Sequence, residues 1–220
     1  MAIVGLTDKP QTQGFPRLGQ FRKGAPKSAN GKAGNDLDHF RFVSDRPGLT
    51  EKVAALFGNT PKELRVRLPF PEVEQNFDPW YREYGSAGLK RQCDGEKQVL
   101  WLPPGENSYR GIEHGDQPLP CQRKTTGCKC GKSTGLKVFI PEIFAAGYCG
   151  YFDLITSSDH DMRHILGVLN TAYAFQGTLS GIDFVIRRKP QEKSYPYETK
   201  DGQQKRGKKA FELIEMEIDP

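Results

Sequence analysis

The chain of 220 residues has no apolar run long enough to cross a membrane as a helix. Such a helix needs about 20 consecutive, mostly apolar residues. The start of the chain also lacks the pattern of a secretory signal, in which a charged start is followed by an apolar stretch and a cleavage site. The sequence therefore predicts a soluble, cytoplasmic protein with no membrane partner.

Motifs of common catalytic sites are missing as well. There is no G-x-S-x-G turn for a nucleophilic serine, and residues 131–135, GKSTG, lack the upstream glycine of a phosphate-binding loop. His160 and His164 have the spacing of two metal ligands on one helix. However, Asp161 stands where the H-E-x-x-H motif has glutamate, and no third ligand is evident. No residues combine a nucleophile, a base and an oxyanion donor, so we expect that this protein is not an enzyme.

Cysteine is scarce, but four of the five cysteines lie in one segment: Cys93, Cys121, Cys128 and Cys130. Four thiolates can enclose one zinc ion in a closed tetrahedral site. We therefore expect a structural zinc ion on these residues, although His114 could replace one cysteine. Unligated thiols and a disulfide or redox pair remain alternatives, and a reducing cytosol disfavours disulfides. Cys149 lies in an aromatic and aliphatic run, where we expect a small buried apolar residue.

The formal charge of +5 is unevenly distributed along the chain. Residues 1–35 hold six basic residues and one acid, and residues 187–209 hold nine basic residues and three acids, whereas the last ten residues hold four acids and no base. Two basic segments suit contact with nucleic acid or with an acidic protein surface. A flexible tail and a solvated loop are the alternative. The candidate partner-binding or nucleic-acid-binding residues are Arg17, Arg22, Lys23, Arg187, Arg188, Lys189, Lys205, Arg206, Lys208 and Lys209.

Composition divides the chain into an arm and one domain. Residues 1–36 are rich in Gly, Pro, Lys and Ser, which indicates a flexible basic arm without its own core. Phe15, Leu18 and Phe21 could stack on bases within this arm, or they could anchor it on the domain surface. Residues 37–220 are expected to form a single domain.

Hydrophobic periodicity predicts two strand–helix–strand units in that domain. Helices are expected after Asp45 and after Ser157, each of which can cap a helix. Strands are expected at about 39–43, 64–68, 136–140, 150–158, 182–186 and 211–218. This βαβ–ββαβ order predicts an α+β fold of ferredoxin or RNA-recognition-motif type, from which a basic hairpin of residues 184–218 projects.

The segment between the two units, at about residues 69–135, shows little sustained period and many Pro and Gly residues. We expect only a short helix near residues 78–84 within it. A loop-rich insertion of this length needs another source of order. The binding free energy of zinc can supply that order, because it becomes folding free energy.

Several fragments together resemble the phage recombination directionality factors that work with large serine integrases. They are PRLGQFRKG, LDHFRFVSD, AALFGN, WYREYGSAGLKRQCDGE, the later PC…C-x-C cluster and GIDFVIRRKPQEKS. The resemblance spans roughly residues 15–195, and the GLKRQCDG and cysteine-cluster segments are its most specific parts.

This resemblance implies a non-catalytic accessory protein. Such a protein would bind a large serine integrase seated on its attachment-site DNA and would favour excision over integration. For Cys93, Cys121, Cys128 and Cys130 it implies only a structural metal role. The alternative function is a protein that binds single-stranded DNA or RNA and carries a structural zinc site.

Overall fold

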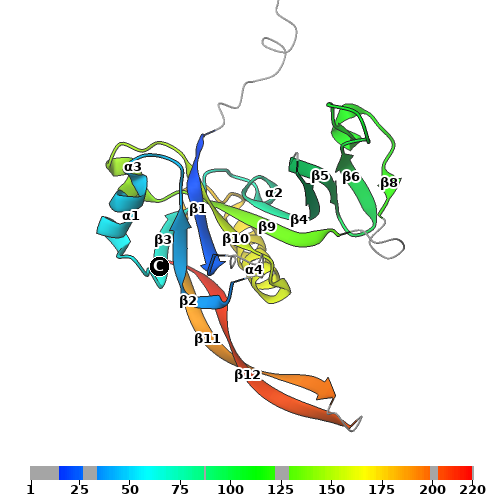
Figure 1. Ribbon diagram of the computed structural model, residues 1–220. Helices are drawn as coiled ribbons and strands as arrows, with labels where there is room; N and C mark the ends of the chain where they lie inside the picture. Colours follow the sequence, from blue (N-terminus) through cyan, green and yellow to red (C-terminus); the bar gives the residue numbers. More distant parts are fainter. Residues whose placement is uncertain (1–14, 27–33, 87, 122–128, 199–202, 220) are drawn as a thin grey trace, which may run out of the picture.

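The computed structural model describes residues 15–26, 34–86, 88–121, 129–198 and 203–219. The chain forms a strand-rich mixture of helices and strands, with two sheets that share one body (Figure 1). The expected α+β class is confirmed. Within the described residues, no helix is long and apolar enough to cross a membrane.

Across the described ranges, the larger sheet has nine strands and does not follow the four-stranded ferredoxin order. β1 and β10 are parallel, and the other neighbouring strands in this sheet are antiparallel. The order is β2 (Asp36–Val43), β1 (Arg17–Gly24), β10 (Tyr151–Thr156), β9 (Gly131–Val138), β4 (Phe77–Gly85), β5 (Gly88–Cys93), β6 (Lys97–Trp101) and β7 (Arg110–Gly111), with β8 (Leu119–Pro120) paired to β6.

The smaller sheet has the order β12 (Gln204–Ile218), β11 (Asp183–Glu198) and β3 (Glu63–Arg67), and all its neighbours are antiparallel. β3 pairs only with the first five residues of β11, at Asp183–Arg187. Beyond that point β11 and β12 continue as a long two-stranded hairpin that projects from the body (Figure 1). The expected hairpin is confirmed by this pairing.

Helices cover parts of both sheets. They are α1 (Leu49–Phe57), α2 (Val73–Asn76), α3 (Pro141–Ala145), α4 (Asp159–Gln176) and the 3-10 turn η1 (Ile112–His114). α4 begins after Ser158, whose side chain accepts a hydrogen bond from the N–H of Asp161, and not after Ser157 as expected. It ends at Gly177, which adopts the left-handed conformation that glycine tolerates. The buried face of α4 joins the core through Ile165, Leu169 and Ala172.

One cluster of buried apolar residues joins both sheets with α1, α3 and α4. Leu18 and Phe21 of β1 belong to it, and Phe21 contacts Phe152 with a ring-centroid distance of 5.6 Å. Residues 17–24 are therefore a core strand, and their placement in a flexible arm was wrong. The prediction failed because residues 17–24 contain Arg and Gly and resemble a solvated segment when they are considered alone. Their partner strand, β10, lies more than 100 residues away in the sequence.

Residues 77–101 form three antiparallel strands where we expected loops and a short helix. β4 pairs with β9 on one side and with β5 on the other. Aromatic residues suit the pleated surface of a strand, and β4 contains Trp80, Tyr81 and Tyr84. The pairing of β4 with strands on both sides overrides the weak helical spacing of these residues. In Figure 1, β5, β6 and β8 form a lobe set apart from the rest of the body.

Candidate cysteine cluster and partner-binding hairpin

The thiols of Cys93 and Cys121 lie side by side, with their Sγ atoms 3.3 Å apart. Cys93 ends β5. Cys121 follows β8, and the N–H of Cys121 donates to the carbonyl of Glu96 at 2.7 Å. The turn between β5 and β6 is held by Asp94, since its Oδ1 accepts hydrogen bonds from the N–H groups of Glu96 and Lys97. Main-chain pairing therefore brings together two cysteines that are far apart in the sequence.

Cys130, directly before β9, contributes a third thiol to the same region. Its Sγ is 4.0 Å from a carboxylate oxygen of Glu83, and it also interacts with the thiol of Cys93. Cys128, the fourth predicted ligand, lies outside the described residues. Within the described part of the chain, no three His, Cys, Asp or Glu side chains form a group that could hold a metal ion.

The chemistry of the paired thiols fits a soft cation. Burial, and then the neighbouring Cys121, raise the pKa of Cys93 to about 11, so a neutral pH leaves the proton in place unless a cation displaces it. Two sulfurs bound at about 2.3 Å to one tetrahedral zinc ion lie about 3.8 Å apart. The observed Sγ separation of 3.3 Å is shorter, so the two thiols would have to move slightly apart to bind such an ion. The described cysteines are free thiols.

His114, considered as a metal ligand, and Cys149, expected in the core, both face solvent. His114 is exposed at the end of η1. Cys149, between α3 and β10, is also exposed, so the expectation of a buried residue was wrong. Its aromatic neighbours in the sequence do not cover it, because the turn that precedes β10 points it outward.

Two of the three basic residues predicted near the start of the chain are engaged within the fold. Arg17 Nε is 2.6 Å from a carboxylate oxygen of Asp153 on the neighbouring strand. The ammonium of Lys23 is 3.2 Å from the buried carboxylate of Asp161. These side chains stabilise β1 in the sheet, and neither is freely available to a partner.

Arg22 differs from both, because it is exposed and lies directly opposite Arg41 in the β1–β2 pair. Partial burial, followed by the positive charges of Arg41 and Arg17, lowers the pKa of Arg22. Of the three predicted basic residues on β1, Arg22 is thus the one that the structure leaves facing solvent without a carboxylate partner among the described residues.

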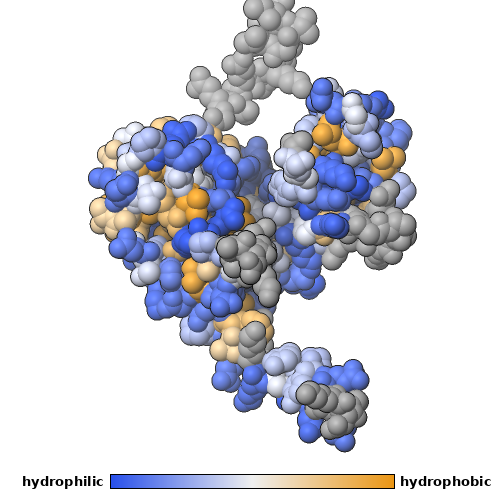
Figure 2. Space-filling model, viewed as in Figure 1, coloured by the Kyte–Doolittle hydropathy of each residue, from blue (hydrophilic) through white to orange (hydrophobic). Residues whose placement is uncertain are grey.

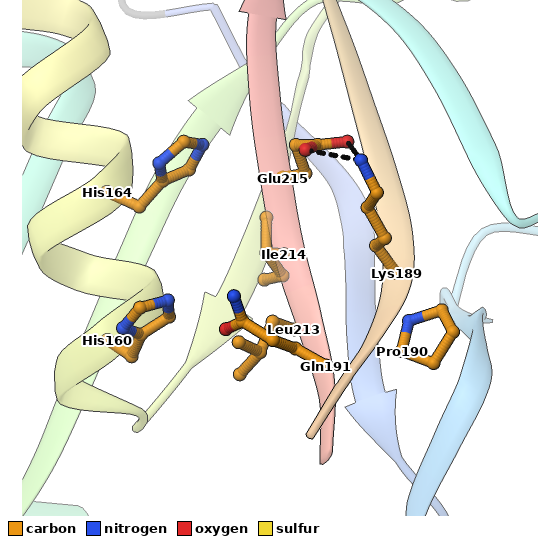
Figure 3. Close-up of a pocket in the computed structure, with 8 residues that line it drawn as sticks. All are labelled: His160, His164, Lys189, Pro190, Gln191, Leu213, Ile214 and Glu215. Atoms are coloured by element: carbon orange, nitrogen blue, oxygen red, sulfur yellow. Dashed lines mark hydrogen bonds and ion pairs between the residues drawn. The ribbon is translucent and has the colours of Figure 1, made fainter. Parts of the chain in front are cut away.

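At the root of the hairpin, two of the predicted basic residues form ion pairs. Arg187 Nε is 2.7 Å from Glu63 of β3, and the same guanidinium contacts Glu217 of β12. These two carboxylates raise the pKa of Arg187. Lys189 Nζ lies 2.8 and 3.0 Å from the two carboxylate oxygens of Glu215 (Figure 3).

Arg188 points into the protein and its side chain is fully buried. Its Nε and Nη2 donate to the carbonyl of Leu37 at 3.2 and 2.9 Å, and its guanidinium carbon is 5.9 Å from the centroid of the Phe40 ring. Alternate residues of a strand face opposite sides of the sheet, so Arg187 and Lys189 face outward while Arg188 faces the core. Arg188 therefore holds β2 against the hairpin and presents no surface to a partner.

The distal part of the hairpin carries the remaining predicted basic residues. Lys205, Arg206 and Lys208 are all exposed on β12, and the main chain of Lys209 belongs to the same strand. Figure 2 shows mainly hydrophilic residues over the described part of this projection. The structure thus separates the predicted set into residues that build the fold and residues that face solvent.

Two tyrosines that the sequence analysis did not single out lie on the same projection. Tyr195 and Tyr197 of β11 are 41% and 42% exposed, and their ring centroids are 6.0 Å apart. The Tyr-x-Tyr spacing was the available signal, since it places both rings on one face of a strand. Large aromatic rings with this exposure on a ribbon without a core are candidate contact residues.

A cavity of about 230 Å³ lies between α4 and the root of the hairpin (Figure 3). His160 and His164 approach it from α4, and Lys189 and Glu215 border it from the strands. His164 is committed to the fold, because its Nε2 accepts a hydrogen bond from the N–H of Met216 at 3.0 Å. The cavity therefore lies at a polar contact between α4 and the root of the hairpin.

No curated protein and no solved structure matches the chain. The family model described as Gp3-like, recombination directionality factor-like, matches residues 18–219 and thus includes both the cysteine cluster and the hairpin. This chain belongs to the Gp3-like family of recombination directionality factor-like proteins.

Proposed function

We propose that this protein is a non-catalytic accessory factor that binds a large serine integrase on its attachment-site DNA and favours excision over integration. The observation that carries the proposal is the family match over residues 18–219. A charged hairpin that projects from a compact body supports it, because such an element suits contact with another macromolecule (Figure 1).

The factor would act by differential binding. It can change the direction of recombination only if it binds one arrangement of the integrase on DNA more tightly than the other. Moving the population of two arrangements from 1:99 to 99:1 needs a preference of about 10⁴-fold. No covalent step by this chain is needed for that effect.

A recombination assay tests this function directly. The full chain is purified and added to the large serine integrase encoded nearest to it in the same genome. Plasmids carry either the integration substrate pair or the excision pair of attachment sites. We expect the protein to inhibit integration and to permit excision in proportion to its occupancy of the integrase. An unchanged product ratio at saturating protein would contradict the proposal.

We also propose that Cys93, Cys121, Cys128 and Cys130 hold one structural zinc ion. The support is the approach of three of these thiols, two of them 3.3 Å apart, at the base of the lobe formed by β5, β6 and β8. When bound, zinc would supply charge neutralisation of the thiolates and a fixed crosslink between β5, β8 and the segment before β9. Elemental analysis of protein purified without added metal tests this, and about one zinc per chain is the expected result.

A further inference from the structure

The hairpin of β11 and β12 is fastened to the body along its root. On one side, β3 pairs with Asp183–Arg187. On the other, α4 accepts the outward N–H groups of β12, since Asp161 Oδ1 bonds Ile214 N at 3.2 Å and His164 Nε2 bonds Met216 N at 3.0 Å. Beyond this root, residues 192–198 and 204–210 pair only with each other among the described residues; these ranges are called the distal hairpin. The distal hairpin therefore projects from a root that is fixed on both sides.

The distal hairpin has little apolar packing of its own. A two-stranded ribbon without further layers is only marginally stable in water. Tyr195 lies across the ribbon over Gly207, where an added Cβ would be 3.2 Å from the ring, and Tyr197 stands beside it. The tyrosine pair thus packs along the ribbon, and the two residues remain 41% and 42% exposed.

The free edge of β11 is poorly suited to pairing with a strand from a partner. The N–H of Arg188 points away from β12, because it donates to Lys62 next to β3. The unbroken register means that positions 190 and 196 have the same orientation, and both are proline. Proline has no N–H, so this edge offers few donors to a partner strand. Strand addition along this edge of β11 is therefore disfavoured, and the side chains of the ribbon are the contact surface of the proposal below.

That surface carries cations that the fold does not neutralise. Lys205 and Arg206 form no ion pair with any other described residue. Lys208 is 3.9 Å from Glu192, but both side chains are largely exposed, and such a pair contributes little.

We propose that the distal hairpin is the docking arm of this protein, with Tyr195 and Tyr197 entering an apolar recess on the partner recombinase. Lys205, on the tyrosine face of the ribbon, would pair with a carboxylate beside that recess, and Arg206, on the opposite face, would pair with a second carboxylate. This inference rests on the proposed function. A protein surface suits the arm better than nucleic acid for two reasons. Tyrosine and arginine contribute strongly at protein–protein contacts. The ribbon face that carries Arg206 also carries the exposed Glu192 and Glu198, which would repel the phosphates of DNA on that face.

Three variants of the full chain test the arm. Tyr195→Ser/Tyr197→Ser removes the rings, and Lys205→Glu/Arg206→Glu reverses two charges. The matched control, Lys52→Glu/Arg163→Glu, makes the same change in net charge on α1 and α4. Binding to the genome-neighbour integrase on its duplex attachment site is measured at two salt concentrations. Recombination direction is scored in parallel, and thermal unfolding of each variant is recorded.

We expect the tyrosine variant to bind about thirtyfold more weakly at both salt concentrations, as for loss of a central contact. The charge-reversed variant should associate more slowly, with the largest effect at low salt. The control should bind within about twofold of the parent, and all three should unfold near the parent temperature, since their side chains lie outside the core.

Other outcomes would contradict the docking-arm proposal, and they distinguish its failure from a failure of the proposed function. If the parent binds and switches recombination while both hairpin variants match it, the arm is excluded and the proposed function stands. If the parent neither binds the integrase nor alters its products, both fall. The parent protein is also tested on a labelled attachment-site duplex without integrase. If it binds that duplex and Lys205→Glu/Arg206→Glu abolishes the binding, the arm contacts nucleic acid and the protein-docking inference is wrong.

Discussion

The carboxylate of Asp161 accepts a hydrogen bond from the main-chain N–H of Ile214 at 3.2 Å. Asp161 is completely buried, and its other oxygen accepts from Thr156 Oγ1 at 2.9 Å and lies 3.2 Å from Lys23 Nζ. One side chain on α4 thus joins β1, β10 and β12. It connects the larger sheet to the root of the hairpin.

We predict that Asp161→Ala lowers the free energy of unfolding by about 3–5 kcal/mol, because it leaves the ammonium of Lys23 and the N–H of Ile214 without their partner. Urea denaturation followed by circular dichroism measures the change. Asp159→Ala is the matched control on the same helical turn. Its carboxylate is exposed and pairs with Lys132, so its loss should cost less than about 1 kcal/mol. Equal losses in both variants would contradict the role of Asp161.

His164 makes the second contact between α4 and the edge of β12. We predict that His164→Phe destabilises the protein by about 1–3 kcal/mol, because the N–H of Met216 loses its acceptor. Hydrogen exchange should show faster exchange of the Met216 amide in particular. His160→Phe, one turn earlier at an exposed position, should leave that amide protected. Unaltered protection of Met216 in both variants would show that His164 does not hold the strand.

Arg188 provides a test of fold against function within the predicted basic set. We predict that Arg188→Gln weakens folding and not docking, because its guanidinium donates two bonds to Leu37 inside the protein. The expected loss in unfolding free energy is about 2–4 kcal/mol, as for a buried charge-assisted contact. Arg206→Gln serves as the exposed comparison and should leave stability within about 0.5 kcal/mol. An Arg188 variant with parental stability and impaired partner binding would reverse this assignment.

The elements that could be predicted from sequence are those with a strong local pattern. α4 was predicted because Ile165 and Leu169 recur at helical spacing after a serine and two acids. β3 was predicted because Leu64 and Val66 alternate with arginines. In both elements, burial follows the local pattern directly.

The elements that were missed depend on distant partners. β1 is a core strand because β10 lies beside it, and no pattern within residues 17–24 indicates that β10 is its neighbour. The same reason explains Arg188, since a basic run predicts solvent exposure and only the sheet position decides which arginine turns inward. Within the cysteine cluster, residue type indicated the candidates, whereas the approach of Cys121 to Cys93 depends on the pairing of β8 with β6.

Arg17 and Asp153 predict a pH dependence that checks their ion pair. Burial raises the pKa of Asp153 above its usual value of 3.8, and the nearby Arg17 lowers it again in part. Arg17→Gln should therefore raise this pKa further. Below both values the carboxyl is neutral and the variant should match the parent. As pH rises through the pKa of Asp153, the parent gains an ion pair that the variant lacks, and a difference of about 1 kcal/mol or less should develop. Urea titrations between pH 3 and pH 7 measure this difference, and a pH-independent gap would contradict it.

Cys121→Ser tests the metal proposal by stability as well as by composition. If zinc joins β5 and β8, the variant should lose its stoichiometric zinc, and its thermal unfolding should no longer respond to a chelator. Because a ligand present at about 1,000 times its Kd stabilises a protein by about 4 kcal/mol, the parent should unfold at a clearly lower temperature once the chelator is added. Cys149→Ser is the control, since this exposed thiol lies outside the cluster, and it should keep both the zinc and the chelator response. A parent that contains no zinc and does not respond to the chelator would leave the thiols of Cys93 and Cys121 as an unligated neighbouring pair. In that case, the order of the lobe would come from the pairing of β4, β5, β6 and β8 alone.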